Sequence, residues 1–194
     1  SVTLSNVGST GGTIGAFGSG AVPLITATGS VLFLSEGATP TFANWRIMDL
    51  EFSGDGGVSD VAIYYYCGAN YITLLRLNIH DFGNPVLTNA VVSSCNAVTP
   101  GHQPWDGSAL VDSNIDDCTT NCYHLGVLTS SFVHGNSITD GGGHNVRLEY
   151  WQHLAISNNT VTNGLLDALT LRAVAYASPP VPVPANPISR YAVL

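Results

Sequence analysis

Five residues of the chain have side chains suited to proton transfer or charge neutralisation, and they recur in a pattern. Asp49, Arg76 and Asp112 occupy equivalent positions of the sequence repeat described below, and His80 and Asp116 occupy another equivalent pair. A β-eliminating lyase needs a cation to neutralise a uronate and a base to take a proton, whereas a glycoside hydrolase needs two carboxylates beside the scissile bond. We expect these residues to line a catalytic groove, and both reaction types stay open.

A second group of carboxylates has the spacing of a stacked column. Asp81, Asp117 and Asp140 each lie two positions after an apolar residue of the repeat. Stacked like charges repel by on the order of 1 kcal/mol or more when partly screened, so something must offset the repulsion. A bound Ca²⁺ takes several carboxylate oxygens and is one interpretation. In the other, each Asp caps its own turn and faces water.

A third group suits the binding of a sugar. His124 and Arg147 are separated by one period of the repeat, Glu149 lies two positions after Arg147, and Trp105 lies in a long loop. Polar groups of this kind orient hydroxyls, and aromatic faces stack on pyranose rings. Glu149 also precedes Arg172 by one period, which favours a structural salt bridge between neighbouring repeats as the alternative.

Residues at equivalent positions imply a structural unit that repeats along the chain. The sequence has a repeat with a period of about 23 residues, within the range typical of solenoids. Short apolar-alternating runs are broken by Asn and Gly, and no helical pattern is present. Five pairs of similar residues follow the period: Leu125 and Leu148, Val133 and Ile156, Asn136 and Asn159, Ile138 and Val161, Gly141 and Gly164. The pattern predicts an all-β fold, a single-stranded parallel β-helix (solenoid) of roughly seven coils.

The repeat is interrupted at two places within a single domain, 1–194. Residues 83–107 form an inserted loop, and such insertions in solenoids often make a binding surface. Residues 175–187 form a Pro-rich excursion that cannot join a central strand. Neither end of the sequence has the pattern of a cap. We therefore expect a piece of a longer protein, or self-association through uncapped coil ends.

The repeats carry a resemblance to a known superfamily. The runs SNNTVTNG, GNSITDGGG and HNVRLEYWQHLAISNN resemble the repeats of right-handed parallel β-helix proteins of the pectate-lyase-like kind. The early run GAFGSGAVPLI resembles a stretch near the start of many secreted carbohydrate-acting members. The resemblance covers most of residues 14–172 and implies a right-handed helix. It leaves the reaction open, because the superfamily includes lyases, hydrolases, epimerases, tailspikes and non-catalytic adhesins.

One motif within the resemblance bears on hydrolysis. Asp116-Asp117-Cys118 is similar to the Asp-Asp motif of polygalacturonase-type hydrolases, and with Asp112 it can supply a pair of carboxylates. The Gly-His-Gly and Arg-x-Lys signatures of that family are only approximated, by Gly143-His144-Asn145 and Arg147-Leu148-Glu149. The motif therefore does not transfer that family's mechanism to this chain.

Composition narrows the partners and the compartment. The chain has 13 Asp and Glu against 5 Lys and Arg, so it offers no basic patch for nucleic acid. No apolar run is long enough to predict a transmembrane helix. Four cysteines in a Gly-rich chain of low charge favour a secreted or cell-surface protein with one or two disulfides.

These observations lead to two hypotheses about function. The first is a secreted carbohydrate-active protein, a polysaccharide lyase or glycoside hydrolase, with a polysaccharide as partner and Ca²⁺ as the candidate cofactor. The second is a non-catalytic structural or adhesive β-helix, such as a component of an adhesin, a tailspike or an extracellular fibre. Side chains clustered within reach of one sugar ring favour the first, and a flat polar surface favours the second.

Overall fold

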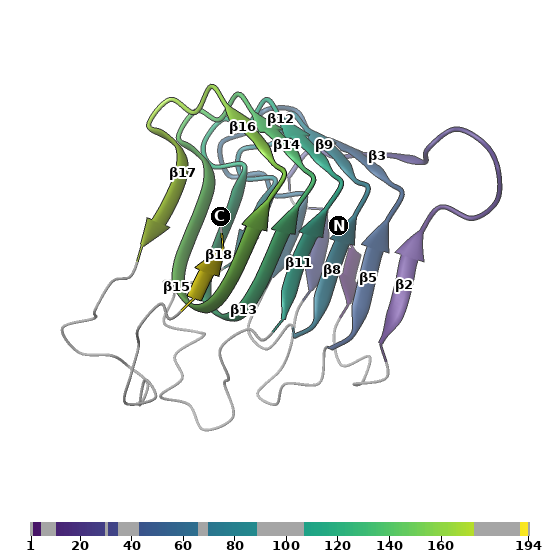
Figure 1. The fold of residues 1–194 in the computed structure, drawn as a ribbon. Coiled ribbons are helices and arrows are strands. Elements are labelled where there is room, and N and C mark those ends of the chain that lie inside the picture. Colours follow the sequence, from purple (N-terminus) through teal and green to yellow (C-terminus); the bar gives the residue numbers. More distant parts are fainter. Residues whose placement is uncertain are drawn as a thin grey trace.

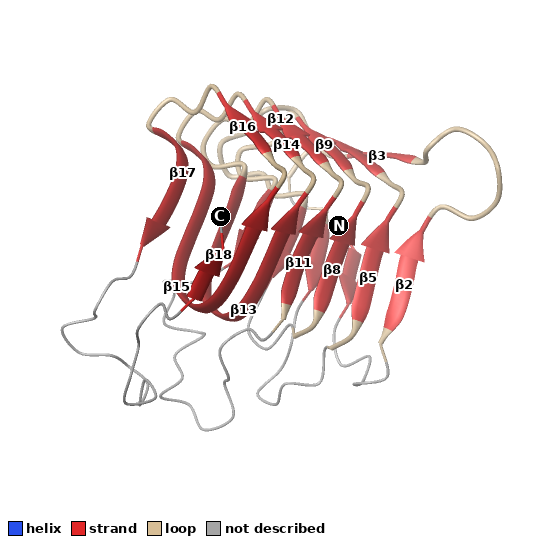
Figure 2. Cartoon of the chain, in the orientation of Figure 1, coloured by secondary structure: helices blue, strands red, loops and turns tan. Residues whose placement is uncertain are grey.

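A computed structural model of the chain describes residues 2–4, 11–29, 31–34, 43–65, 70–88, 107–172 and 191–193. These residues form strands and turns, and every strand pairing among them is parallel. Figures 1 and 2 show the strands stacked in successive coils along one axis, without a helix in the described part. The expected all-β parallel solenoid is confirmed. Within the described residues, no helix is long and apolar enough to cross a membrane.

Each coil has three faces, which we call A, B and C. Face A contains β2 (Gly12–Gly15), β5 (Trp45–Met48), β8 (Ile72–Leu75), β11 (Ser108–Val111), the second halves of β13 (Tyr123–His134) and β15 (His144–Ser157), and β18 (Tyr191–Val193). Face B contains β3 (Leu24–Thr26), β6 (Glu51–Ser53), β9 (Asn78–His80), β12 (Asn114–Asp116), β14 (Ser137–Thr139) and β16 (Thr160–Thr162). Face C contains β1 (Val2–Leu4), β4 (Leu32–Leu34), β7 (Ile63–Tyr65), β10 (Val86–Thr88), the first halves of β13 and β15, and β17 (Asp167–Arg172).

The coil count is lower than expected. On face B the described residues have six strands, which make five steps from coil to coil, so roughly seven coils was wrong. Paired residues of β3, β6 and β9 are separated along the sequence by the same spacing as Asp49 and Arg76. Paired residues of β12, β14 and β16 have a shorter spacing, the same as between Asn136 and Asn159. The step from β9 to β12 is longer than either. The part of the chain that the structure describes therefore makes about four regular turns and one longer turn. The count failed because the period alone does not distinguish a partial coil from a complete one.

The core is built from columns of inward apolar residues, one from each coil. On face B, Phe52, Ile79, Ile115 and Ile138 stack in register and are buried. Each such residue removed from water stabilises the fold by about 1.5–3 kcal/mol. Alternate residues point outward, so a polar residue beside a core position faces solvent on a fixed face. The core columns therefore decide where the candidate site residues lie.

A ladder of polar side chains runs inside the corner between faces A and B. The Asn159 side-chain oxygen accepts hydrogen bonds from the backbone and side-chain nitrogens of Asn136, at 3.0 and 2.8 Å. The Asn136 oxygen accepts from the Ser113 backbone N–H, and the Ser113 hydroxyl accepts from the Leu77 N–H. Asn136 and Asn159, one of the pairs that follow the sequence period, thus contact each other in the structure. The ladder satisfies backbone groups that the turn removes from the strand ladders.

Two columns of turn residues have left-handed backbone conformations. At the corner between faces A and B these are Asp49, Arg76, Asp112, Gly135 and Asn158; at the corner between faces B and C they are Asp81, Asp117, Asp140 and Asn163. Asn, Asp and Gly tolerate a positive φ at low cost. The acidic residues that occupy equivalent positions of the repeat are therefore turn residues of successive coils.

Two further expectations concern loops and cysteines. Residues 86–88 of the expected 83–107 loop form strand β10. Its residues 89–106 and the Pro-rich excursion 175–187 lie outside the described residues. Cys118 and Cys122 form a disulfide, which agrees with the expectation of one or two disulfides. It closes a short turn between faces B and C.

Candidate functional site

His80 is the centre of a cluster of charged side chains on face B. It ends strand β9, where its side chain points outward, next to the buried Ile79. Its Nδ1 lies 2.7 Å from Asp81 Oδ2 and its Nε2 lies 3.1 Å from Glu51 Oε1. Both ring nitrogens are thus held by carboxylates, one from the same coil and one from the coil before.

The carboxylates control the charge of this imidazole. Desolvation lowers the pKa of His80, but the hydrogen bonds to Asp81 and Glu51, together with the charges of Asp81 and Asp116, outweigh it. The pKa of His80 therefore lies above its ordinary value, and the ring is held as a cation over a wider pH range. A protonated ring donates from both nitrogens and fixes both carboxylates.

Asp116 reaches the same cluster from the next coil. Its backbone pairs in register with His80. The Asn114 side-chain amide donates to Asp116 Oδ2 at 3.1 Å and to the Asn78 oxygen at 3.0 Å. Face B thus carries polar side chains across three coils, from Glu51 through His80 and Asn78 to Asn114 and Asp116.

Arg76 and Asp49 form a separate pair at the corner of faces A and B. The guanidinium donates two hydrogen bonds to the carboxylate of Asp49, at 2.6 and 2.8 Å. This pair lowers the pKa of Asp49 and raises that of Arg76. Asp112, on the other side of Arg76, adds only a longer-range attraction. Of the five expected catalytic residues, His80 and Asp116 lie together on face B, while Asp49, Arg76 and Asp112 lie along the corner.

The expected calcium column consists of three turn residues with different contacts. Asp81 bonds His80, and Asp140 Oδ1 accepts a hydrogen bond from the Asn163 side chain at 3.1 Å. Among the residues whose side chains are described, no group of three or more His, Cys, Asp or Glu is arranged to hold a metal ion. The positive φ of Asp81, Asp117 and Asp140 agrees with the turn-capping interpretation. Calcium binding there stays a prediction that these contacts do not support.

Two of the expected sugar-binding residues, His124 and Arg147, lie on face C, away from His80. His124 and Arg147 are neighbours in register, and Arg147 pairs in turn with Thr170. The backbones of Glu149 and Arg172 also pair, as the repeat spacing predicts. The side chain of Glu149 and the whole of Trp105 lie outside what the structure describes. Sugar binding by these four residues stays a prediction.

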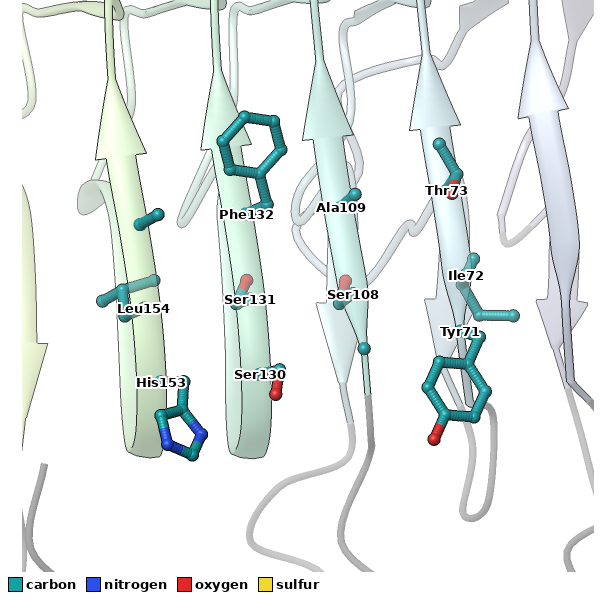
Figure 3. A pocket seen from close by; sticks show the side chains of 12 residues that line it. Tyr71, Ile72, Thr73, Ser108, Ala109, Ser130, Ser131, Phe132, His153 and Leu154 are labelled. Carbon is teal, nitrogen blue, oxygen red and sulfur yellow. The ribbon is translucent and has the colours of Figure 1, made fainter. Parts of the chain in front are cut away.

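A depression on face A was not foreseen from the sequence. It has a volume of about 440 Å³, and its lining includes Tyr71, Thr73, Ala109, Phe132 and His153 (Figure 3). None of the expected catalytic residues lines it. The charged cluster is therefore on an open face, and the hollow is on a different one.

Glu51 is the member of the cluster to which the sequence assigned no role. It pairs in register with Asn78, but its side chain reaches diagonally to His80 in the next coil. Glu51 could be found from the sequence if residues diagonal to His80 in the neighbouring coil were considered as well as residues in the same column. Comparisons with protein-family models, with curated proteins and with solved structures found no match to this chain.

Proposed function

We propose that this protein is a secreted or cell-surface carbohydrate-active β-solenoid that hydrolyses a polysaccharide bound across face B. The observation that carries the proposal is His80 held between the carboxylates of Glu51 and Asp81, with Asp116 in the following coil. Carboxylates gathered around an imidazole whose pKa they raise are a suitable set for acid–base chemistry on a glycosidic bond.

Glu51 and Asp116 are the proposed reacting carboxyl groups. They come from the coils on either side of His80, whose strands lie about 9.6 Å apart along the axis. The Glu51 side chain leans towards His80 in the middle coil, which brings its carboxyl group closer to Asp116 than the strands are to each other. Inverting hydrolases hold their two carboxyl groups roughly 6.5–9.5 Å apart, which leaves room for a water molecule. One carboxyl group donates a proton to the glycosidic oxygen. The other removes a proton from the water that attacks the anomeric carbon, and the two sugar ends separate with inversion.

The contacts favour hydrolysis over elimination. A lyase needs a cation against the uronate, and the Arg76 guanidinium is already paired with Asp49 through two hydrogen bonds. The acidic turn column supplies no described ligand set for calcium. Glu51 and Asp116, by contrast, face solvent on the same face as His80 and are only partly buried.

The finer fold assignment is part of the proposal. The parallel coils and the internal Asn ladder are features expected of the right-handed, pectate-lyase-like β-helix that the repeats resemble. The Cys118–Cys122 disulfide supports an oxidising compartment, and therefore a secreted or cell-surface protein.

A non-catalytic structural or adhesive role is the second candidate. In its favour, the charged groups of the cluster already satisfy one another, Asp49 with Arg76 and His80 with Glu51 and Asp81. Ion pairs of this kind also occur as plain surface structure. The two candidates differ in one measurable property, because only the first requires bond cleavage.

The test is incubation with neutral and uronate-containing polysaccharides, followed by assays of new reducing ends and of unsaturated sugar ends. Hydrolysis gives reducing ends without unsaturation, and Glu51→Gln or Asp116→Asn should lower the rate by about 10²-fold or more. Asp140→Asn is the matched control, because it removes one carboxylate from face B's border without touching His80. Unsaturated ends would indicate a lyase instead, and no cleavage by folded protein across the panel would favour the structural role.

A further inference from the structure

The depression on face A is built from aromatic and small residues. Figure 3 shows the rings of Phe132 and Tyr71 on either side of the strand that carries Ala109. Thr73, Ala109 and Phe132 are register neighbours on β8, β11 and β13, so the floor spans three coils. A cavity of about 440 Å³ is within the range of small-ligand sites.

Phe132 is an exposed aromatic ring in a fixed orientation. Phe132 is 42% exposed although it lies on strand β13. The ring stacks on His134, with centroids 5.4 Å apart and planes within 8°. His134 is in turn held by the Ser157 hydroxyl, 2.8 Å from Nδ1. Phe132 is therefore ordered before any ligand arrives, which lowers the entropic cost of binding.

Tyr71 occupies a position where its own backbone is strained. Its φ is 53°, and the register neighbours of the flanking coils at this turn are Asn44 and Gly107, which tolerate a positive φ. A bulky side chain there costs stability, and such costs are often found at functional sites. The ring is half exposed and lies over Gly107, where an added Cβ would be 2.5 Å from it.

None of the described residues that line the depression carries a carboxylate, guanidinium or ammonium group. Hydroxyls of Thr73 and Ser130 lie among the apolar surface, and His153 is at one end (Figure 3). A ligand matched to this lining has an apolar ring face for the aromatic rings and hydroxyls for the polar groups. The net charge of −8 disfavours an acidic ligand.

We propose that the face A depression is a binding site for a neutral saccharide, with pyranose rings packed against Phe132 and Tyr71. The site is separate from the cluster around His80. The test below measures binding alone, so its result does not depend on whether face B hydrolyses a polysaccharide.

The experiment is calorimetric titration of the full chain with cello-, manno- and malto-oligosaccharides, and with oligogalacturonate for comparison. Oligosaccharides of at least one neutral series should bind, and Phe132→Ala or Tyr71→Asn should raise their Kd by about tenfold. Phe17→Ala is the matched control, since Phe17 is fully exposed and outside the depression, and it should leave the Kd unchanged. Saturation-transfer NMR should show the sugar ring protons in contact with aromatic side chains.

Three results would overturn the proposal. These are no binding of any neutral oligosaccharide to folded protein, a Kd unaffected by both variants, or tighter binding of oligogalacturonate. Sedimentation of the same variants adds one more: a dimer that Phe132→Ala dissociates would make face A an interface between copies of the chain. Circular dichroism and thermal melts establish that each variant is folded, and Tyr71→Asn keeps a residue suited to the turn.

Discussion

Tyr71 and Arg76 stand at the two ends of strand β8, and both have positive φ, 53° and 50°. At the Arg76 turn, the corresponding residues of the other coils are Asp49, Asp112, Gly135 and Asn158. The coil that begins with β8 thus places two long side chains where the fold prefers short ones. The same coil supplies His80. Both proposed sites therefore contain residues of this one coil, and the positive φ angles at its turns lower its local stability.

The first prediction concerns the strain at Tyr71. Tyr71→Asn and Tyr71→Ala both remove the ring, but only Asn tolerates the left-handed backbone. The free energy of unfolding of the Asn variant should exceed that of the Ala variant by about 1 kcal/mol. Urea unfolding followed by circular dichroism measures the difference. Equal stabilities would mean that the turn stores no strain.

The period of about 23 residues predicts the core register of the later coils, whereas the steps from Phe52 to Ile79 and from Ile79 to Ile115 are longer. Phe52, Ile79, Ile115, Ile138 and Val161 form one column in the structure, and Leu125, Leu148 and Leu171 form another. Burial enforces this register, because a slip of one residue would turn every core side chain outward. The contact between Asn136 and Asn159 also agrees with the period that separates them.

The contacts of the site were less predictable. The repeat places Arg76 between Asp49 and Asp112. Arg76 bonds Asp49 and not Asp112 because of side-chain conformations, which the sequence spacing does not determine. Glu51 reaches His80 across a diagonal. The face A depression escaped prediction because Tyr71 and Phe132 lie in different columns, and because small neighbours such as Gly107 and Ala109 make the hollow.

The second prediction concerns the Asn ladder. Asn136 is buried and its amide donates to Leu110 O and Asn159 while accepting from Ser113 N–H. Asn136→Leu leaves several of these groups unpaired and should lower the free energy of unfolding by about 2–4 kcal/mol. Urea unfolding measures this. Asn158→Gly is the control, because the corresponding turn position of the preceding coil is already Gly135, and it should be near neutral.

The third prediction concerns the disulfide. Cys118 and Cys122 are buried and close a short turn. Replacing both by Ala restores entropy to the unfolded chain and should lower the free energy of unfolding by about 2 kcal/mol. Substitution is preferable to a reductant, since the chain has two other cysteines. An unchanged unfolding curve for the double variant would show that the bond adds no stability.

The fourth prediction concerns the pH dependence that His80 gives to stability. Its pKa is raised in the folded protein, so the folded state binds the proton more tightly than the unfolded state. This contribution is fully present below the ordinary pKa of 6.5 and is lost as pH rises through the higher folded pKa. The free energy of unfolding should therefore fall as the pH rises above about 6.5 and through the higher folded pKa, with a smaller fall in His80→Gln.

The partners of His80 provide the control for that titration. Glu51→Gln and Asp81→Asn each remove one carboxylate from the ring, so each should reduce the fall in stability and move the NMR titration of His80 to lower pH. Asp140→Asn removes the same charge from a turn that does not contact the ring, and it should change neither. A wild-type profile that His80→Gln leaves unaltered would show that the imidazole is not held as a cation. The cluster would then lose the charge pattern on which its proposed chemistry depends.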